Sequence, residues 1–179
     1  LRATASTRFP SCEPAANLPP LVIETGGHLP ITTPEGTTLR SLAERRGFYI
    51  GTAVEPHYLN DPAYRQLLAR EFNMLTPENA MKWQNIQPQP GVYRFSAGDA
   101  VVSFAVQHGM AVRGHVLVWD FQNPDWLVQG QFSRKDLIQV LCIHIKTVVS
   151  RYRGYIHSWD VVNEAVNTDG SLRNTFWMR

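Results

Sequence analysis

The chain has 179 residues, enough for one domain of ordinary size, and 44% of them are hydrophobic, a proportion typical of a globular core. Its net charge is only +2, so the sequence carries no strong basic field of the kind that binds nucleic acid. No run of apolar residues approaches the roughly 18 that a membrane-spanning helix needs. We therefore expect neither a nucleic acid nor a membrane among its partners.

Residues 1–46 differ in composition from the rest of the chain, and we predict that they form a leader or linker with little regular structure. Six of the twelve prolines lie there, together with many Thr and Gly residues. A short helix over 39–46 is compatible with the pattern. From residue 47 onward, strand and helix signals alternate, so 47–179 form the second predicted unit.

Four strands are predicted in this second unit, where β-branched and aromatic residues concentrate: 48–54, 72–76, 110–118 and 155–162. A long loop through Trp83 separates the second strand from the next helix. The helix between the first two strands begins at Asp61, an N-cap residue followed by proline. The two later helices begin at capping boxes, Ser96 with Asp99 and Ser133 with Asp136.

Strands that alternate with capped helices predict an α/β fold with a parallel sheet and right-handed crossovers. An open doubly wound sheet would usually place a Gly-rich phosphate loop after the first strand, but residues 54–57 read Val-Glu-Pro-His. We therefore favour a TIM (β/α)8 barrel, which needs eight strands and typically ~250 residues. Residues 47–179 would supply about the first four strands.

Cys12 and Cys142 are the only cysteines. Their separation, without a CxxC motif, does not suggest a metal site. Because Cys142 lies between Leu141 and Ile143, we expect a buried free thiol rather than a disulfide.

Polar and aromatic residues follow the predicted strands at the edge where barrel enzymes hold their active sites. They include Glu78, Asn79, Lys82, His115, Trp119, Asn163 and Glu164. Amides and carboxylates bond to hydroxyl groups, and aromatic faces stack on sugar rings, so this mixture suits a neutral polyhydroxylated ligand. A phosphate ligand would favour backbone nests and arginine.

Taken singly, each of these residues also has an ordinary structural explanation. Glu164 could be a surface carboxylate beyond a strand, and His115 a satisfied core histidine. Glu78 and Asn79 could cap the segment that follows them. The case for function therefore depends on the residues as a set.

Three segments, 76–83, 113–119 and 159–165, resemble the signatures of strands two, three and four of glycoside hydrolase family 10. Residues 51–54 and 169–173 fit the same family, so the resemblance covers about 47–179. An Asn-Glu pair after the fourth strand is shared by many barrel glycosidases. Three motifs in the right order are far more specific.

The resemblance implies a retaining endo-β-1,4-xylanase that acts on xylan or xylo-oligosaccharides without a cofactor or metal. Glu164 matches the general acid/base, and Asn163 the amide that bonds the sugar 2-hydroxyl. Residues that match hydroxyl-binding groups on the non-reducing side of the cleaved bond are Glu78, Asn79 and Lys82.

Around the cleaved sugar, His115 and Trp119 match the floor and wall of the site, and Gln122 matches the amide that follows this tryptophan. One departure is visible, because the family usually has histidine after this tryptophan and this sequence has Asp120. The departure puts the local hydrogen bonding and pH response in doubt.

A retaining mechanism needs a second carboxyl group ~5–5.5 Å from the acid/base. In the family this nucleophile comes from the seventh strand, which residues 47–179 do not reach. Glu78 is a poor substitute, because it lies two strand spacings, ~9–10 Å, from Glu164. An alternative function is a non-catalytic half-barrel that binds xylan weakly, or pairs with a second copy or a C-terminal half-barrel.

We expect secretion, because a polymer such as xylan cannot enter a cell. No intact signal peptide is visible at the N-terminus, and a processed terminus would look the same.

Overall fold

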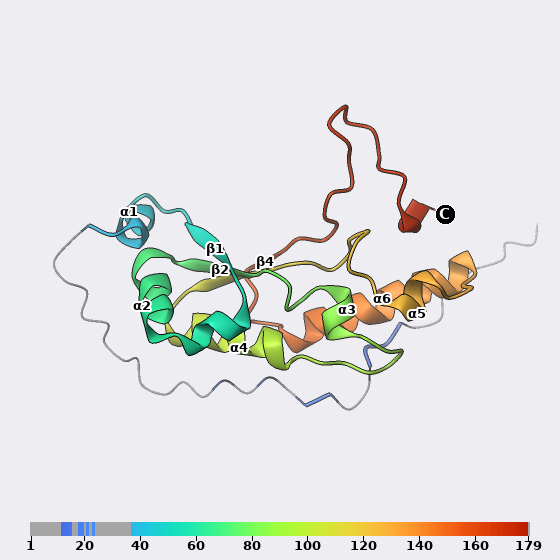
Figure 1. The fold of residues 1–179 in the computed structure, drawn as a ribbon, viewed down its shortest axis with the longest axis horizontal. Helices are drawn as coiled ribbons and strands as arrows, with labels where there is room; N and C mark the ends of the chain where they lie inside the picture. The colour runs from blue at the N-terminus through green and yellow to red at the C-terminus, as the bar shows by residue number, and fades with distance from the viewer. Residues whose placement is uncertain (1–11, 16–17, 20, 22, 24–36, 179) are drawn as a thin grey trace, which may run out of the picture.

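The structure is a computed structural model that describes residues 12–15, 18, 19, 21, 23 and 37–178 (Figure 1). Its centre is a sheet of four parallel strands in the order β1-β2-β3-β4. The strands are β1 (Gly51–Val54), β2 (Met74–Pro77), β3 (Ala111–Gly114) and β4 (Ser158–Trp159). The predicted parallel α/β architecture is confirmed, and all four strands are shorter than predicted.

Side-chain hydrogen bonds explain why β1 begins later than predicted. The side chain of Asn73 accepts a hydrogen bond from the backbone N–H of Ile50 (2.7 Å) and donates one to the carbonyl of Phe48 (3.2 Å). These contacts replace part of the regular strand pairing before Gly51, where the ladder with Met74 begins.

The described helices comprise four longer ones and two of a single turn: α1 (Leu39–Arg45), α2 (Pro62–Glu71), α3 (Trp83–Ile86), α4 (Ser96–Gln107), α5 (Asp125–Val128) and α6 (Arg134–Arg151). Two 3-10 turns, η1 (Pro56–Asn60) and η2 (Phe176–Met178), complete the described elements. The short helix allowed near 39–46 is present as α1. Within the predicted long loop, α3 is an addition that the sequence pattern did not indicate.

Two of the three predicted helix starts are confirmed. Asp61 caps α2 by accepting a hydrogen bond from the N–H of Ala63 (2.8 Å), and Ser133 caps α6 by accepting one from the N–H of Asp136 (3.2 Å). The prediction of a capping box at Ser96 is wrong. Ser96 is already the first residue of α4, and Asp99 pairs instead with Arg151 of α6.

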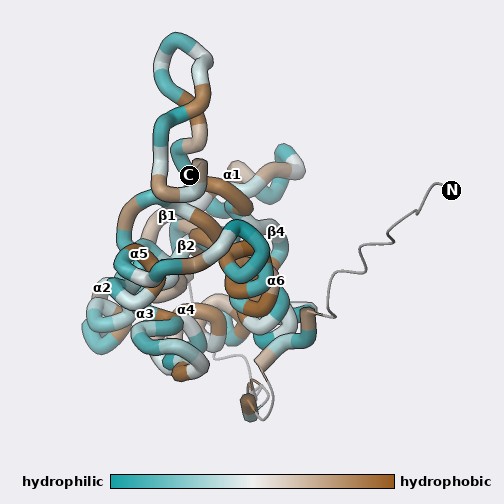
Figure 2. The backbone as a smooth tube through the Cα atoms, turned by 90° about the vertical axis from the view of Figure 1, so that its right-hand side faces the viewer, coloured by the Kyte–Doolittle hydropathy of each residue, from teal (hydrophilic) through white to brown (hydrophobic). Residues whose placement is uncertain are grey.

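The hydrophobic core lies where the sheet meets α4 and α6. Val54, Leu75 and Val112, one from each of the first three strands, are fully buried, as are Val101 of α4 and Val148 of α6. Burying a side chain of this size contributes roughly 1.5–3 kcal/mol. In Figure 2 the hydrophobic stretches gather around the strands and α6, with hydrophilic turns outside. Within the described part of the chain, no helix is both long and apolar enough to cross a membrane.

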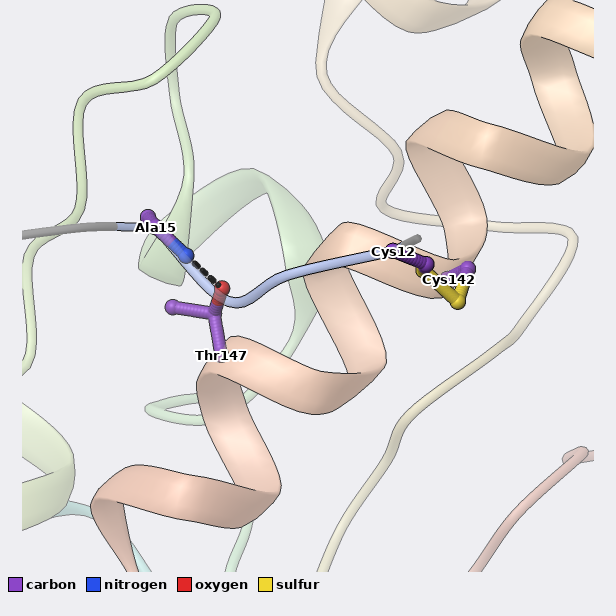
Figure 3. Close-up of a disulfide and its surroundings, with 4 residues drawn as sticks. All are labelled: Cys12, Ala15, Cys142 and Thr147. Carbon is purple, nitrogen blue, oxygen red and sulfur yellow. Dashed lines mark hydrogen bonds between the residues drawn. A yellow bond between two sulfur atoms is a disulfide. The ribbon is translucent and has the colours of Figure 1, made fainter. Parts of the chain in front are cut away.

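The described residues between 12 and 23, which we call the N-terminal clasp, lie along α6. Cys12 forms a disulfide with Cys142, with a Cα–Cα distance of 6.1 Å (Figure 3). The N–H of Ala15 donates to the Thr147 hydroxyl (2.8 Å), and the carbonyl of Pro19 accepts from Arg151. These residues form no helix or strand. The boundary at residue 46 stays a prediction.

The prediction of a buried free thiol at Cys142 is therefore wrong. Cys142 lies on a half-buried part of α6, with Cys12 from a distant segment placed against it. The apolar neighbours of Cys142 indicated burial, but they carried no information about a partner 130 residues away.

After β4 the chain leaves the body of the molecule as a long loop, drawn in red in Figure 1 and projecting upward in Figure 2. Val161 and Val162 are each 56% exposed in this segment, and Leu172 is 62% exposed. The parallel bridge between Val118 and Val162 holds the start of the loop beside the segment after β3.

Candidate active site

Behind the end of β2, three polar side chains are linked to one another. The Asn79 amide donates to Glu55, which follows β1, and accepts a hydrogen bond from the Lys82 ammonium group (2.8 Å). Lys82 is only 7% exposed. A buried ammonium group is costly unless it has partners, and these contacts fix its position.

Lys82 also connects β2 to β3. Its Nζ lies 4.8 Å from the centroid of the Trp119 ring, within the range of a cation–π interaction. Trp119 in turn reaches the end of β4, because its Nε1 donates to the Glu164 carboxylate (3.2 Å). A continuous chain of contacts, Asn79–Lys82–Trp119–Glu164, therefore crosses three neighbouring strand ends.

Glu164 occupies an open position in this chain of contacts. Its side chain is 45% exposed and accepts a second hydrogen bond from Arg173 (3.0 Å). The backbone of Glu164 has a φ of 51°, in the left-handed region that residues other than glycine seldom adopt. Outliers of this kind concentrate at functional sites, although they do not identify the function.

His115 is held by a carboxylate rather than by the core. Its Nδ1 lies 2.9 Å from the Asp160 carboxylate, which Arg113 also contacts through Nε (2.8 Å). Partial burial raises the pKa of Asp160, but the hydrogen bonds from Arg113 and His115 outweigh it, so that this pKa lies below its ordinary value. Asp160 is therefore a charged anchor that fixes the orientation of the His115 ring.

The remaining predicted residues make fewer side-chain contacts. Glu78 is exposed, and its side chain has no hydrogen bond within residues 37–178. Asn163 is half-buried, and its N–H donates to the carbonyl of Val118 (2.9 Å). Gln122 has a φ of 52°, its carbonyl accepts from the N–H of Gln84 (2.9 Å), and its buried Oε1 has no partner in the described part of the chain.

Asp120, at the departure from the family pattern, binds main chain. Its carboxylate accepts a hydrogen bond from the N–H of Phe176 (2.8 Å), and the carbonyl of Trp119 accepts one from Trp177 Nε1 (2.8 Å). These two bonds tie η2 back to the end of β3. The Asp120 side chain thus has a structural role in this chain.

A buried aromatic group supports the β2 end from behind. Trp83 stacks on His144 of α6 with 3.7 Å between ring centroids, and both rings bond to the side-chain oxygen of Gln87 at 3.0 Å. Burial lowers the pKa of His144 to about 3. At neutral pH this histidine is uncharged, and it acts as a packing partner for the segment that carries Asn79 and Lys82.

Three contributors were not singled out from the sequence. Asp160 stood inside the third motif and Arg173 inside the last matching segment, but neither had a role assigned. Glu55 is the first polar residue after β1, so the rule that directs attention to strand ends would have found it.

Comparison with known proteins places these features in a family. A sequence model described as glycosyl hydrolase family 10 matches residues 38–179. Endo-1,4-beta-xylanase B of Thermotoga neapolitana is 43% identical over 144 residues, covering 79% of this chain and 42% of that protein. Endo-1,4-beta-xylanase A of Phanerodontia chrysosporium is 38% identical over 175 residues, covering 96% of this chain and 43% of that protein.

Solved structures agree with the sequence match. Native xylanase 10B of Thermotoga maritima has a TM-score of 0.75 and 44% identity over 79% of this chain and 44% of its own. Xylanase 10B of Thermotoga petrophila RKU-1, in complex with xylobiose, has a TM-score of 0.76 and 40% identity over 81% of this chain and 45% of its own. A third match is a mutant protein in complex with xylotriose. It has a TM-score of 0.72 and 40% identity, and the match covers 80% of this chain and 45% of that protein's chain.

The chain spans less than half the length of each of these relatives. Its four parallel strands match part of the TIM barrel of the solved structures. From the match over residues 38–179 and these identities, the chain belongs to glycosyl hydrolase family 10.

Proposed function

We propose that this chain carries the acid/base side of a retaining endo-β-1,4-xylanase site, with Glu164 as general acid and base. The observation that carries the proposal is the contact chain Asn79–Lys82–Trp119–Glu164, which joins a sugar-binding set of groups to a carboxylate at one edge of the sheet. Relatives that are endo-1,4-β-xylanases support the substrate class.

In the first half of the proposed reaction, the Glu164 carboxyl group gives its proton to the leaving glycosidic oxygen. In the second half, the same group removes a proton from the attacking water. Asn163 bonds the sugar 2-hydroxyl while positive charge develops on the ring. Trp119, which donates to Glu164 at 3.2 Å, limits the directions in which the carboxyl group can point.

Sugar binding on the non-reducing side falls to Glu78, Asn79 and Lys82. Lys82 has donors to offer a hydroxyl group, and its burial between Asn79 and Trp119 means that little side-chain entropy is lost on binding. His115, fixed by Asp160, and Gln122, whose Oε1 lacks a partner within the described residues, are suited to further hydroxyl contacts.

The nucleophile needs a separate source. Glu78 is assigned to sugar binding and Asp160 to orienting the His115 ring, so we assign neither of them as the nucleophile. We place the nucleophile on a segment outside residues 47–179, ~5–5.5 Å from Glu164 in the assembled site.

Xylan or a xylo-oligosaccharide is the proposed partner, in line with the two related structures that hold xylobiose and xylotriose. We also propose that the protein is secreted. The Cys12–Cys142 disulfide supports an oxidising compartment, because such bonds form and persist mainly outside the cytosol.

A non-catalytic role is the second candidate, in which the chain binds xylan weakly or pairs with a second copy or a C-terminal half-barrel. The exposed valines at 161 and 162 favour it, since apolar side chains next to a sheet edge are suited to association. Reducing-sugar release by a protein that contains this chain together with the nucleophile segment, lost on Glu164→Gln, would exclude a role limited to binding.

The proposed role of Glu164 is tested by Glu164→Gln in such a complete protein, which keeps the shape and removes the proton donor. We expect xylan cleavage to fall by about 10²–10⁴-fold. An aryl glycoside whose leaving group needs little protonation should keep a much faster first step, and added azide should speed release of the trapped intermediate. The matched control is Glu44→Gln on α1, an exposed carboxylate remote from the site.

Equal slowing of both substrates by Glu164→Gln, with no response to azide, would remove the acid/base assignment. Loss of activity in the Glu44→Gln control would indicate a general loss of folding instead.

A further inference from the structure

Gln87, the residue that directly follows α3, is buried and meets three aromatic side chains. It is 5% exposed. Its side-chain Oε1 lies 3.0 Å from Trp83 Nε1 and 3.0 Å from His144 Nδ1, and its backbone carbonyl accepts a hydrogen bond from Trp126 Nε1 (3.1 Å). These three rings belong to α3, α6 and α5, so Gln87 joins the three helices at one point. The proposed mechanism assigns it no role.

The indole N–H of Trp83 determines how the Gln87 amide is oriented. An indole nitrogen can only donate, so the side-chain atom that it meets must be the amide oxygen. That oxygen can only accept, so His144 Nδ1 must carry the proton of the neutral ring. His144 Nε2 is then the unprotonated nitrogen, and it is buried without a hydrogen-bond partner among the described residues. Gln87 therefore selects the form of His144 that stacks on Trp83.

Gln87 also holds the main chain of Trp83. Its backbone N–H donates to the Trp83 carbonyl (2.8 Å), the bond that closes α3. A single helical turn is unstable in isolation, so α3 depends on contacts of this kind. Lys82 is the residue from which α3 starts, and its carbonyl accepts a hydrogen bond from the N–H of Ile86 (3.0 Å). The turn that Gln87 closes thus sets the point from which the Lys82 side chain extends.

We propose that Gln87 is a positioning residue of the sugar site: it fixes Trp83, and through Trp83 the place at which Lys82 and Asn79 meet the sugar. Groups that bind a ligand are held precisely only when the residues behind them are locked by packing and hydrogen bonds. Because Gln87 is buried, it acts through Trp83 and does not touch the sugar. The inference rests on the proposed function, since it requires that Lys82 and Asn79 bind sugar.

The test joins the ring nitrogens of His144 to the affinity of the 179-residue chain for xylotriose. In the nitrogen-15-labelled wild type at pH 7, NMR spectra should show the proton of the His144 ring on Nδ1. Gln87→Met keeps the length of the side chain and removes the acceptor, so xylotriose binding should weaken by about fivefold, the loss that one hydrogen bond accounts for. Gln87→Glu keeps the acceptor and should bind xylotriose nearly as tightly as the wild type.

Two controls separate positioning from a general loss of folding. Gln107→Met makes the same change at an exposed position at the end of α4 and should leave the affinity unchanged. Val101→Ala, at a fully buried position of α4, should lower the free energy of unfolding without weakening xylotriose binding.

If xylotriose binds the wild type, three results would each show that the inference is wrong while the proposed function stands. These are equal binding by Gln87→Met and the wild type, equal weakening by Gln87→Met and Val101→Ala, and a His144 proton on Nε2. The last result needs no variant, so it can contradict the inference even if Gln87→Met fails to fold. If the wild type binds no xylotriose, both the inference and the proposed function are wrong.

Discussion

The two walls of the candidate site are held in different ways. The β2 wall, formed by Asn79, Lys82 and Trp83, is enclosed, with Lys82 7% and Trp83 3% exposed. The β4 wall, formed by Asn163 and Glu164 with the loop that follows, is open, and the Glu164 side chain is 45% exposed. The position of the β2 wall is thus determined by packing within this chain, whereas the position of the β4 wall depends on a few surface contacts.

The difference follows from what stands behind each wall. Behind the β2 wall Trp83 stacks on His144 of α6, and the N-terminal clasp covers α6 through a disulfide and hydrogen bonds. Behind the β4 wall the chain projects as a loop with exposed valines (Figures 1 and 2). Positioning of binding groups needs a rigid support, which the β2 wall has. The proposed retaining mechanism needs a second carboxylate near Glu164, which we place on a segment outside residues 47–179.

The largest stability contrast is expected from two arginines that each pair with a carboxylate. Arg151, on the supported side, has an 8% exposed side chain that pairs with Asp99. Arg151→Gln leaves that carboxylate without its charged partner and should cost about 3–5 kcal/mol. Arg173, on the open side, pairs with Glu164 through side chains that are 38% and 45% exposed. Arg173→Gln should cost no more than about 1 kcal/mol.

Urea unfolding of both variants measures the contrast. Equal costs for Arg151→Gln and Arg173→Gln would show that the two walls are supported to the same degree, and the contrast between them would be wrong.

The clasp should contribute the next largest effect. Cys12→Ser removes a cross-link that closes a loop of 130 residues, and the free energy of unfolding should fall by about 2–5 kcal/mol. The double variant Cys12→Ser, Cys142→Ser should have the same free energy of unfolding as the single variant. A reductant should lower the free energy of unfolding of the wild type to the same value. A wild type that is insensitive to reductant, with an unchanged single variant, would mean that the clasp does not support α6.

An effect that is absent at neutral pH and appears only in acid is expected from His144. Its pKa is about 3 in the folded state because of burial, below the ordinary value of 6.5, so the unfolded chain binds the extra proton between these values. Stability should therefore fall as pH drops from about 6.5 towards 3, by up to about 1.4 kcal/mol per pH unit from this group. His144→Gln should flatten the curve, whereas His157→Gln, at an exposed position, should not. Identical pH curves for wild type and His144→Gln would contradict the buried, neutral histidine.

Local patterns predicted the parts of the fold that local chemistry determines. Asp61 and Ser133 cap their helices as expected, because an N-cap is satisfied by backbone groups within three residues. Ser96 follows the same pattern, but Asp99 has a stronger partner in Arg151, and the helix begins one residue earlier than a serine cap requires. A tertiary ion pair displaced a local motif there.

Contacts between distant residues left no such signal. The disulfide joins Cys12 to Cys142 across 130 residues, and neither sequence neighbourhood indicates the other. The ends of β2, β3 and β4 were placed together because parallel strands share an edge. The order of contact, with Lys82 over Trp119 and Trp119 on Glu164, depends on side-chain directions that strand patterns do not encode.

One titration tests the contrast between the walls most directly. Xylotriose is added to the isotope-labelled 179-residue chain, and amide and tryptophan signals are recorded together with the anomeric signals of the sugar. The account predicts saturable shifts at Asn79, Lys82 and the Trp83 ring, with no new reducing ends over the time of the experiment. Hydrolysis of the sugar by this chain, at a rate above that of Glu164→Ala, or shifts confined to the β4 wall, would contradict it.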